Sequence, residues 1–414
     1  MRSLFPARTT ARPGVGGTLR QTPEDFIVVE APRAAPTGDG EYLSFLVRKR
    51  NKTTALVANM LARALGTRAT NVAYAGRKDR NALTTQSFTV WVGEQCVQPP
   101  SRLGKDVEIL RVERTDQPLH VGDLAGNRFI ITIRDVEASR AEEAGAVLRS
   151  LQDRGAPYSF GAQRFGARSV NHLVGAAMAR RDWEAALCAL LGAEGAAGLR
   201  DFEARRAFAA GSAQDALAAW PRGASPERQV IAALAQGSTP KDALLAMAAR
   251  HRFLFISALQ AAVFNSALSA RIAAGTWRTP VKGDIAVDLS QRFNQAGSSG
   301  GAAMPVGTAD ACPTGPMWGP DMPRASGAID AAEVDVLLRL GVTVDNTLGL
   351  ADIVEGGSIG VRRPLRMPVF DACAMGGEDK RGSFIRCEFT LPPGGFATIV
   401  LREVMGDSDA CAPA

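Results

Sequence analysis

One aspartate lies between two cations on a short segment that has the residues for acid–base or nucleophilic chemistry. Asp79 follows Lys78 and precedes Arg80, on a turn that begins at Gly76. Neighbouring positive charge favours the ionised form of a carboxylate, and an ionised carboxylate can act as a nucleophile or as a base. A Lys-Asp-Arg triplet is also common on ordinary solvated turns, so the rest of the chain has to decide between the two interpretations.

Histidine, cysteine and nucleotide-binding chemistry find little support in the chain. Its three histidines are His120, His172 and His251, and no two of them have the spacing of metal ligands. The six cysteines form no Cys-x-x-Cys pair, which favours a reducing cytoplasm and argues against a zinc site. No glycine fingerprint of a Rossmann or P-loop site is present. We therefore expect no metal site, and a chemistry built on carboxylates, amides, hydroxyls and cations.

The overall charge of the chain suits a polyanionic partner. The formal net charge is +6 and the isoelectric point is about 9.2. Only seven of the 48 basic residues are lysines. The arginines can pair bidentately with phosphate and stack on bases, although the codon usage of a GC-rich genome accounts for much of this ratio. The positive sign is the feature that favours a nucleic acid.

The elements expected to position Asp79 are strands and a few helices near the two ends of the chain. Residues 87–92 alternate directly after the segment 76–86 that contains the aspartate, with Phe88, Val90 and Val92 on one face. Further strands are expected at 26–30, 42–47, 128–134 and 384–391. Helices are expected at 51–65, capped by Asn51 or Thr53, and at 141–151 and 396–404.

The middle of the chain has a different composition. Residues 172–262 are rich in Ala, Leu and Arg with helical periodicity, whereas 283–327 are rich in Gly and Pro and are expected to be irregular, with a mobile loop at 297–301. Strand-rich ends around a helical middle indicate an α+β domain interrupted by an inserted domain. No apolar run looks long enough to span a bilayer, and the basic start of the chain lacks the apolar segment of a secretory signal.

Seven separate segments resemble the TruD family of tRNA pseudouridine synthases, and they follow the order of that family from about residue 18 to residue 404. The longest has twelve residues, 75–86, and resembles the segment that carries the family's nucleophile. The other segments are Pro23-Glu24-Asp25-Phe26, Gly126-Asn127-Arg128-Phe129, Phe160-Gly161-Ala162-Gln163-Arg164-Phe165-Gly166, Ala262-Val263-Phe264-Asn265, Gly315-Pro316-Met317-Trp318-Gly319 and Leu391-Pro392-Pro393-Gly394-Gly395-Phe396-Ala397-Thr398. One stretch departs from the family pattern, since Pro157-Tyr158-Ser159-Phe160-Gly161 stands where the family usually has Pro-Asn-Tyr-Phe-Gly.

The resemblance implies both a fold and a reaction. The fold is α+β: a pseudouridine-synthase-like catalytic domain with a mixed, mostly antiparallel sheet, formed by residues 1–152 and 367–414, and a mainly helical RNA-binding insert of the TRUD type at 153–366. The reaction is the isomerisation of uridine to pseudouridine at position 13 of tRNA, with tRNA for glutamate as the expected substrate. No redox change or hydrolysis occurs, so no cofactor is needed. Asp79 is expected to attack C1′ of the ribose as a nucleophile or to take a proton from C2′ as a base.

The same motifs supply the substrate-binding candidates. A uridine in folded RNA must be extruded before its ribose can be reached, which calls for an aromatic platform. Phe129 is the first candidate for the platform, with Phe26 and Phe396 as neighbours, although all three could be ordinary core residues. The Asn127 amide suits the orientation of the uracil edge or of Asp79.

Cationic and amide side chains complete the expected site. Arg20 is placed to hold Asp79 ionised and oriented, and Lys78 is expected to contact phosphate or to shape the turn. Gln86 is expected to hydrogen-bond the backbone near the nucleophile or to start a strand. Arginines in or near the insert are candidates to grip the tRNA backbone, or are simply solvated: Arg164, Arg168, Arg180 and Arg181.

We thus expect a cytoplasmic, monomeric enzyme whose partner is tRNA, with no membrane and no protein partner. One alternative is the same chemistry on a different RNA, which a map of pseudouridine in cellular RNA with and without the gene would distinguish. A second alternative is a non-catalytic RNA-binding protein with a relic site, against which the intact segment around Asp79 counts. A metal- or nucleotide-dependent RNA enzyme lacks any supporting motif.

Overall fold

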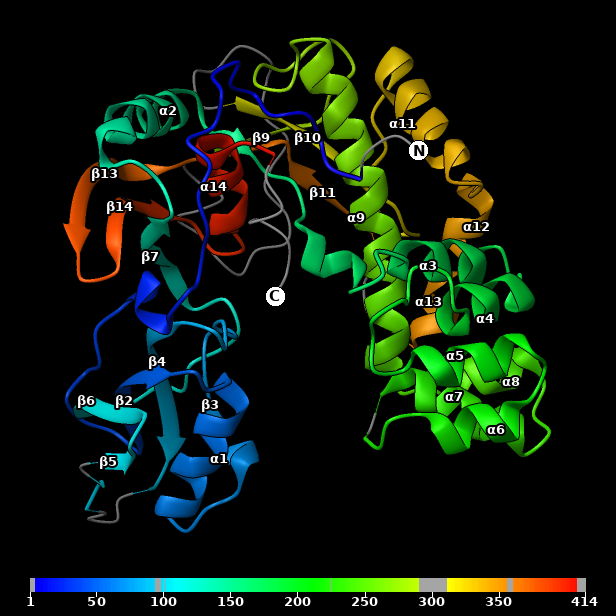
Figure 1. Cartoon of the computed structure of the whole chain (residues 1–414), viewed down its shortest axis with the longest axis horizontal. Coiled ribbons are helices and arrows are strands. Elements are labelled where there is room, and N and C mark those ends of the chain that lie inside the picture. Colours follow the sequence, from blue (N-terminus) through cyan, green and yellow to red (C-terminus); the bar gives the residue numbers. More distant parts are fainter. Residues whose placement is uncertain are drawn as a thin grey trace.

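The computed structural model describes residues 4–93, 98–100, 102–223, 225–289, 311–355 and 360–407. The loop expected at 297–301 lies outside these residues. Figure 1 shows two arms that diverge downward from a shared upper part: strands and helix α1 form one arm, and helices α3 to α8 with the lower part of α9 form the other.

One large sheet dominates the first arm and the shared upper part. Its strand order is β13-β14-β7-β1-β4-β2-β6-β5, and β3 also pairs with β4. The strands are β1 (Phe26–Pro32), β2 (Tyr42–Arg50), β3 (Val72–Ala73), β4 (Leu83–Trp91), β5 (Arg102–Gly104), β6 (Val107–Thr115), β7 (Leu124–Arg134), β13 (Phe370–Asp379) and β14 (Gly382–Leu391). Only β1 and β4 run parallel; the other pairs are antiparallel. The expected α+β class with a mixed, mostly antiparallel sheet is therefore confirmed.

The strands expected from alternation are present, but several are longer than expected. β2 continues to Arg50 and β4 already begins at Leu83. β5 and β6 were not expected from the sequence, because β6 is a largely exposed strand with charged residues on both faces and therefore has a weak alternation signal. Helix α1 (Thr54–Ala64) begins one residue after Thr53, whose hydroxyl accepts the Leu56 N–H at 3.2 Å.

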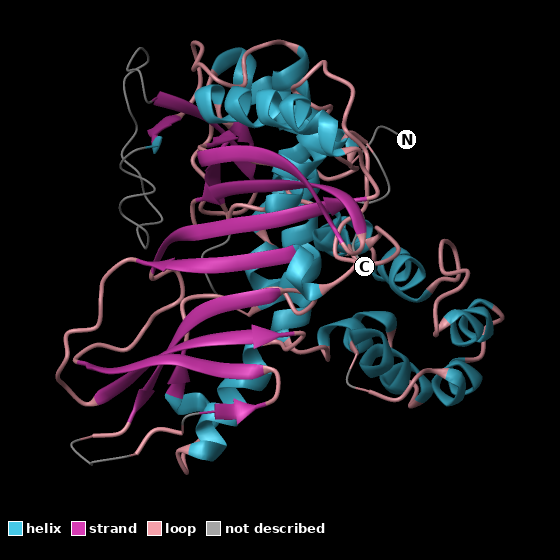
Figure 2. Cartoon of the chain, turned by 60° about the vertical axis from the view of Figure 1, so that its left-hand side comes forward, coloured by secondary structure: helices cyan, strands magenta, loops and turns pink. Residues whose placement is uncertain are grey.

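Helices cover one face of the sheet, in two groups. Strand pairing places Phe26 and Val28 of β1 on the same face as Phe45 and Val47 of β2. Over β1, β7 and β14 this face packs against α2 (Ala141–Arg154) and α14 (Ala397–Met405). Over β2 and β4 the same face packs against α1. Figure 2 shows the sheet in front of these helices, with its other face free of helices.

The second arm is helical, as expected for the middle of the chain. Its helices are α3 (Asn171–Ala179), α4 (Trp183–Leu191), α5 (Phe202–Ala209), α6 (Ala213–Ala219), α7 (Pro226–Ala235), α8 (Pro240–Leu245), α9 (Ala249–Ala273), α11 (Gly327–Arg339), α12 (Val344–Leu348) and α13 (Leu350–Val354). Apart from the helices of this arm, short 3-10 helices occur elsewhere in the described chain: η1 (Pro23–Asp25), η2 (Ala69–Asn71), η3 (Ala138–Arg140) and η4 (Ala162–Phe165). A separate apolar core joins α3 to α8 with α9 and α11 to α13.

Helix α9 corrects the expectation about membrane-spanning length. Among the described residues it is the one helix long and apolar enough to cross a bilayer, with a mean hydropathy of 1.6 over its most apolar window. Of that window, 72% is buried inside the protein. Its polar residues are also bonded internally: Gln260 donates to the Trp318 carbonyl at 2.8 Å, and Asn265 exchanges two hydrogen bonds with the Phe160 backbone. These are the features of a core helix.

The Gly/Pro-rich stretch is less irregular than expected. β10 (Ala311–Met317) is a buried strand that pairs with β9 (Ala286–Asp288) and β11 (Val361–Pro364). Its residues Pro313, Gly315 and Pro316 are poor strand formers. Packing overrides that preference. The strand lies so close to Leu365 and Phe264 that a Cβ at position 315 would come within 3.0 Å of both side chains, and glycine alone has no Cβ.

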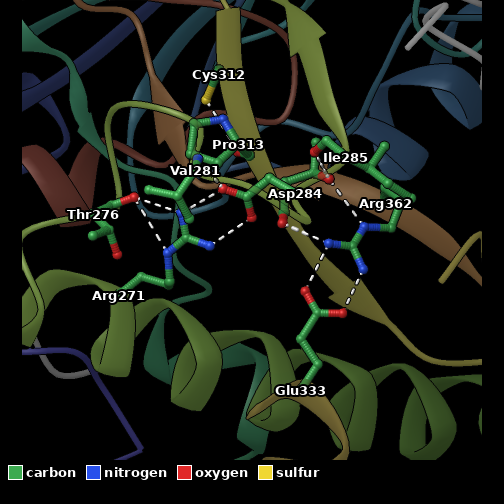
Figure 3. A network of polar contacts seen from close by, with 10 residues as sticks. Arg271, Thr276, Val281, Asp284, Ile285, Cys312, Pro313, Glu333 and Arg362 are labelled. Atoms are coloured by element: carbon green, nitrogen blue, oxygen red, sulfur yellow. Dashed lines mark hydrogen bonds and ion pairs between the residues drawn. The ribbon is translucent and has the colours of Figure 1, made fainter. Parts of the chain in front are cut away.

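Buried charges fasten this small sheet to α9 and α11. Figure 3 shows Arg271 of α9 bound to Asp284, with contacts of 2.6 and 2.7 Å, and Arg362 of β11 bound to Glu333 of α11 over similar distances. Burial raises the pKa of Glu333, while the Arg362 guanidinium acts in the opposite direction. Both pairs are bidentate, which fixes the geometry of the helices as well as their separation.

The chain enters and leaves the helical part at one place. β8 (Ala156–Pro157) pairs with β12 (Arg366–Met367), close to the expected boundaries at residues 152/153 and 366/367. The boundaries themselves stay a prediction. The N-terminal segment strengthens the junction, because the Leu4 carbonyl accepts from Asn265 of α9 and the Thr9 and Thr10 amides donate to Glu403 of α14. The family-like segment 262–265 thus takes part in holding the two parts together.

Candidate active site

Asp79 lies on the loop between β3 and β4, where its carboxylate meets Arg20. Its side chain is 39% exposed, and Oδ2 lies 3.3 Å from Nη2 of Arg20. The guanidinium in turn lies over the Phe26 ring, 4.1 Å from its centroid. The structure therefore brings together an accessible carboxylate and a cation within ion-pair distance.

Arg20 has an unusual backbone conformation that directs it toward Asp79. Its φ is 60°, in the left-handed region that residues other than glycine seldom adopt. The turn is held by backbone hydrogen bonds in both directions between Thr18 and Arg134. Gly17 (φ 90°) passes so close to β7 that a Cβ there would lie 2.6 Å from the Arg134 carbonyl oxygen. Non-glycine residues in this region cluster at functional sites, where surrounding contacts over-determine them.

The Pro23-Glu24-Asp25-Phe26 motif supports this turn from below. The buried Asp25 carboxylate accepts from the Thr22 amide at 2.9 Å and pairs with Arg134 at 2.7 Å. Phe26 is 1% exposed and forms the floor under Arg20. The sequence motif thus marks the support of Arg20, a role the sequence analysis did not assign to Asp25.

Lys78, beside the catalytic candidate, points into the protein. Its side chain is 6% exposed, and Nζ lies 2.6 Å from Oε2 of Glu30 and donates to Oδ1 of Asn127 over the same distance. Glu30 also accepts the Ser87 amide at 3.0 Å. Of the two roles expected for Lys78, these contacts fit the shaping of the turn. They also leave the Asn127 NH₂ group as a donor.

The loop backbone before Asp79 is tied to α1 and β4. The Lys78 amide donates to the Thr54 hydroxyl at 3.0 Å, and this hydroxyl donates to Gln86 Oε1 at 2.9 Å. Gln86 Nε2 donates to the Gly76 carbonyl at 3.2 Å. The expectation that Gln86 bonds the backbone near the nucleophile is therefore confirmed.

A buried lysine holds the other side of the loop. Lys49 is 0% exposed, and its ammonium donates to the carbonyls of Asp79 at 2.8 Å and Lys52 at 2.7 Å. Sequence reasoning missed Lys49 and Glu30, although a signal existed. Leu43, Phe45 and Val47 alternate inward on β2, and one more step of two reaches Lys49. The inward series Phe26 and Val28 reaches Glu30 in the same way.

These polar residues lie where the two cores under the sheet meet. The inward stripe of β1 belongs to the core with α2 and α14, and that of β2 belongs to the core with α1. The inward stripe of β1 ends in Glu30 and that of β2 ends in Lys49, and both residues lie on the same face of the sheet. Polar groups at the seam between two apolar clusters are sheltered from water on both sides, which strengthens their electrostatic effect on Asp79.

The aromatic candidates divide into two places. Phe129 is 6% exposed and packs edge-to-face on Phe26 and at 5.6 Å on Phe389. Phe396 is 37% exposed and lies 6.5 Å from Phe160. Among the described residues Phe396 forms no ring contact, hydrogen bond or ion pair with the other candidates. Phe396 nevertheless follows shortly after Leu391, the residue that pairs with Asn127 between β14 and β7.

The candidate arginines of the insert have internal partners. Arg168 donates to the carbonyls of Ala189, Leu190, Gly192 and Glu194 at the end of α4. Arg181 pairs with Asp352 at 3.1 Å and Arg180 with Asp182 at 3.8 Å. Burial lowers the pKa of Arg164, which lies over Phe160 and donates to Ser257. By contrast, Arg77 and Arg80 on the Asp79 loop are exposed.

The arrangement can therefore present one ionised carboxylate, on a fixed loop, to a substrate from the solvent side. An exposed carboxylate whose loop is anchored by buried groups is preorganised for nucleophilic attack or proton abstraction. No group of three or more His, Cys, Asp and Glu residues suited to a metal ion occurs in the described part of the chain.

Comparison with known proteins gives one family throughout. The profile of the family described as tRNA pseudouridine synthase D (TruD) matches residues 6–404. A protein of Geotalea daltonii named tRNA pseudouridine synthase D is 36% identical over 97% of this chain and 100% of its own length. Its namesake in Geobacter metallireducens is 35% identical over 96% of both chains. A crystal structure of a TruD protein from Methanosarcina mazei superposes with a TM-score of 0.79 at 27% identity, covering 98% of this chain and 97% of that one.

Proposed function

Because this chain belongs to the TruD family of tRNA pseudouridine synthases, we propose that it isomerises uridine 13 in the D-arm of tRNA, with tRNA for glutamate as a substrate. The reaction is proposed to occur at Asp79. The observation that carries this assignment is the accessible Asp79 carboxylate, paired with Arg20 on a loop that buried groups anchor from both sides. An isomerisation needs no co-substrate, since nothing is oxidised, reduced or hydrolysed overall.

Two routes through Asp79 balance. As a nucleophile it forms an ester with C1′ while the N1–C1′ bond breaks and its electrons leave with the uracil. After the base turns, C5 attacks C1′ and releases the carboxylate. As a base it takes the C2′ proton while the N1–C1′ bond breaks, and it returns that proton when C5 bonds to C1′. In both routes C5 finally loses its proton and N1 gains one.

The neighbouring residues have distinct roles in this proposal. Arg20 aims the Asp79 carboxylate through its ion pair, and the donor group of Asn127 binds a uracil oxygen. Phe129 and Phe26 shape the floor beneath the extruded base, and the half-exposed Phe396 offers a stacking surface from β14 and α14. Lys78 acts through Glu30 and Asn127 by fixing the donor that faces the substrate.

Binding of the tRNA is proposed to depend on shape and on phosphate contacts. The two arms seen in Figure 1 are suited to a folded RNA with one base extruded between them. Exposed Arg77 and Arg80 flank the reacting carboxylate and are placed to contact phosphates beside the target nucleotide. We further propose that the enzyme acts in the cytoplasm as a monomer.

The test is pseudouridine formation on unmodified tRNA transcripts, with wild type, Asp79→Asn and the control Asp39→Asn, an exposed aspartate on a distant loop. Asp79→Asn should lose at least about 1,000-fold in turnover, as expected for a covalent or proton-transferring group. Its tRNA affinity should fall less than about tenfold, or 1.4 kcal/mol. Full activity of Asp79→Asn would refute the assignment.

The transcript and its isotopes separate the remaining alternatives. A transcript with cytidine at position 13 should give no product if that position is the target. Deuterium at C2′ should slow the reaction only if Asp79 is the base. Tight binding of tRNA without conversion of any tRNA or other cellular RNA would favour the non-catalytic RNA-binding protein.

A further inference from the structure

Lys49 is a buried cation whose hydrogen bonds to the loop end on the backbone of Asp79. The side chain is inaccessible to solvent, and Nζ donates to the Asp79 carbonyl at 2.8 Å and the Lys52 carbonyl at 2.7 Å. Lys52 lies two residues before the first residue of α1. The ammonium therefore joins the loop of the reacting residue to the start of the helix beneath it.

The backbone of Lys78 and Asp79 is held at two points. Thr54, the first residue of α1, accepts the Lys78 N–H, and Lys49 donates to the Asp79 C=O. These two hydrogen bonds lie on either side of the peptide bond between Lys78 and Asp79, so together they restrict the direction in which the Asp79 side chain leaves the loop. That direction matters because a displacement of about 1 Å at a reacting atom can cost about 100-fold in rate.

Asp79 is the acid whose negative charge most stabilises the positive charge of Lys49. Within the described residues no carboxylate forms an ion pair with Lys49. The surrounding charged groups are Asp79 with its partner Arg20, Lys78 with its partner Glu30, and the pair Lys52–Asp106. Burial lowers the pKa of Lys49 to about 8; the Asp79 charge opposes that shift and the Lys78 charge adds to it.

The choice of lysine at this position is itself informative. Only seven of the 48 basic residues are lysines, so the composition of the chain favours arginine. Lys49 and Lys78 are the two whose side chains are buried, and both serve the Asp79 loop. A compact ammonium can direct its protons at two converging carbonyls, whereas the planar guanidinium needs more space and a different geometry.

We propose that Lys49 is a positioning residue for the reaction assigned to Asp79: its ammonium form holds the Asp79 backbone in the reactive orientation, and loss of that proton loosens the loop by removing the charge that strengthens both hydrogen bonds. The inference rests on the proposed function and adds a residue that does not touch the substrate. It also predicts a pH dependence that belongs to the enzyme and is not shared by the RNA.

The stability of the fold separates this role from a structural one. Because the pKa of Lys49 is lowered from its ordinary value of 10.5, the folded protein binds this proton less tightly than the unfolded chain does. The charged lysine therefore opposes folding below about pH 8, and this opposition fades as the pH rises from 8 toward 10.5. Replacing the ammonium with an apolar group should leave the melting temperature within a few degrees of wild type at neutral pH.

The experiment compares wild type, Lys49→Met and the exposed lysine control Lys105→Met in single-turnover pseudouridine formation from pH 7 to 9.5. At pH 7 we expect Lys49→Met to lose about 100-fold in rate, with a tRNA Kd within about threefold of wild type. At pH 9.5 the ratio of the two rates should fall below about tenfold, because few wild-type molecules then keep the proton. Ionisation of uridine affects both proteins alike and cancels in the ratio.

Two outcomes would overturn the proposal: a Lys49→Met rate above one third of wild type at pH 7, or a rate ratio that stays constant with pH. A variant that fails to fold does not end the test, because the wild-type rate alone must fall about tenfold per pH unit above its alkaline pKa. Absence of that decline would also contradict the proposal.

A readout without turnover distinguishes failure of this inference from failure of the proposed function. Amide hydrogen exchange of residues 77–82 should be faster in Lys49→Met than in wild type at pH 7 and unchanged in Lys105→Met. If wild type converts no RNA but hydrogen exchange behaves as expected, the proposed function is refuted and the structural role of Lys49 is supported. If exchange of residues 77–82 is unchanged by Lys49→Met, the role proposed for Lys49 is refuted whatever the activity.

Discussion

The sheet part and the helical part of the molecule both bury cations, but they use them differently. In the sheet part, Lys49 and Lys78 converge on the loop of Asp79, with Glu30 as the buried acid between strands. In the helical part, Arg205 is 3% exposed and donates to the Leu190 carbonyl at 2.7 Å and the Gly192 carbonyl at 3.3 Å, at the end of α4. Arg168 donates to the same turn.

The physical reason is the same in both places. The last carbonyls of a helix lack partners within the helix and carry partial negative charge, so a guanidinium beside them is stabilised. Arg228 uses the Leu217 and Trp220 carbonyls in this way, and Arg252 uses Met247. The carbonyl of Asp79 offers an equivalent acceptor on a loop. One interaction, a buried cation on carbonyls, thus closes helix ends in one part and holds the Asp79 loop in the other.

The largest effect on stability should come from breaking the buried pair of the sheet part. Glu30→Gln keeps the shape of the side chain but leaves the Lys78 charge without its acid, which should destabilise the protein by about 3 kcal/mol in denaturant unfolding. Turnover should also fall, because Lys78 then holds Asn127 less firmly. The double variant Glu30→Gln/Lys78→Met should recover part of the stability but not the activity.

The control for that prediction is Glu142→Gln, whose side chain is 83% exposed in a surface pair with Arg149. It should leave unfolding and turnover at wild-type values. Equal stability of Glu30→Gln and Glu142→Gln would mean that the buried pair of Lys78 and Glu30 does not hold the Asp79 loop.

The matching change in the helical part should affect stability alone. Arg205→Met removes two charge-assisted hydrogen bonds to α4 and the pair with Asp201, at an expected cost of about 2 kcal/mol. Single-turnover rates at saturating tRNA should stay within about twofold of wild type, because this cation does not contact the Asp79 loop. A large loss of rate without loss of stability would show that Arg205 of the helical part also acts on the reaction.

Exposed arginines beside Asp79 should determine affinity and not fold stability. The double variant Arg77→Ala/Arg80→Ala should weaken tRNA binding by about tenfold and reduce the slope of log Kd against log salt by roughly one to two units. Unfolding in denaturant should not change. Exposed Arg200→Ala in the helical part is the matched control, and an equal effect there would locate the phosphate contacts elsewhere.

The smallest effect should come from a surface pair next to the site. Arg50 donates to Glu24 at 2.6 Å, and this hydrogen bond is the first cause of the lowered pKa of Glu24. Since the pKa is lowered, the stabilisation is present above the ordinary value of 4.5 and is lost as the pH falls through the folded value. Both side chains are half exposed, so Glu24→Gln should lower the melting temperature at pH 7 by less than about 2 °C.

That small difference should shrink in thermal unfolding as the pH falls through the lowered pKa of Glu24, because the wild-type carboxylate then loses its charge as Gln has. A melting difference that does not change with falling pH would show that Glu24 supports the turn by packing and not by charge.

Several structural roles could be predicted from the chain alone. Alternation identified the central strands, and Thr53 was one of two cap candidates, with Asn51, of which the structure uses Thr53. Family-like motifs identified Asp79, Arg20 and Asn127, which the fold brings together around the Asp79 loop. Local patterns predict these features because they depend on neighbours within a few residues.

Other features depended on contacts between distant segments. Nothing local distinguishes Arg168, which closes α4, from Arg77, which faces solvent, because both are arginines in ordinary polar surroundings of the sequence. β10 was missed because packing against Phe264 and Leu365 overrides the poor strand propensity of its prolines and glycine.

The sequence by itself therefore determined the family, the candidate carboxylate and the periodic elements, since each is encoded in short runs of residues. The tertiary structure decided which charges are buried and which are free. Glu30, Lys49 and Lys78 come from separate segments of the chain. They gather around the Asp79 loop because β1, β4 and β2 are neighbours in the sheet, above the seam between its two apolar cores. Burial removes water as a competitor, and that is what turns three ordinary charged residues into the support of one aspartate.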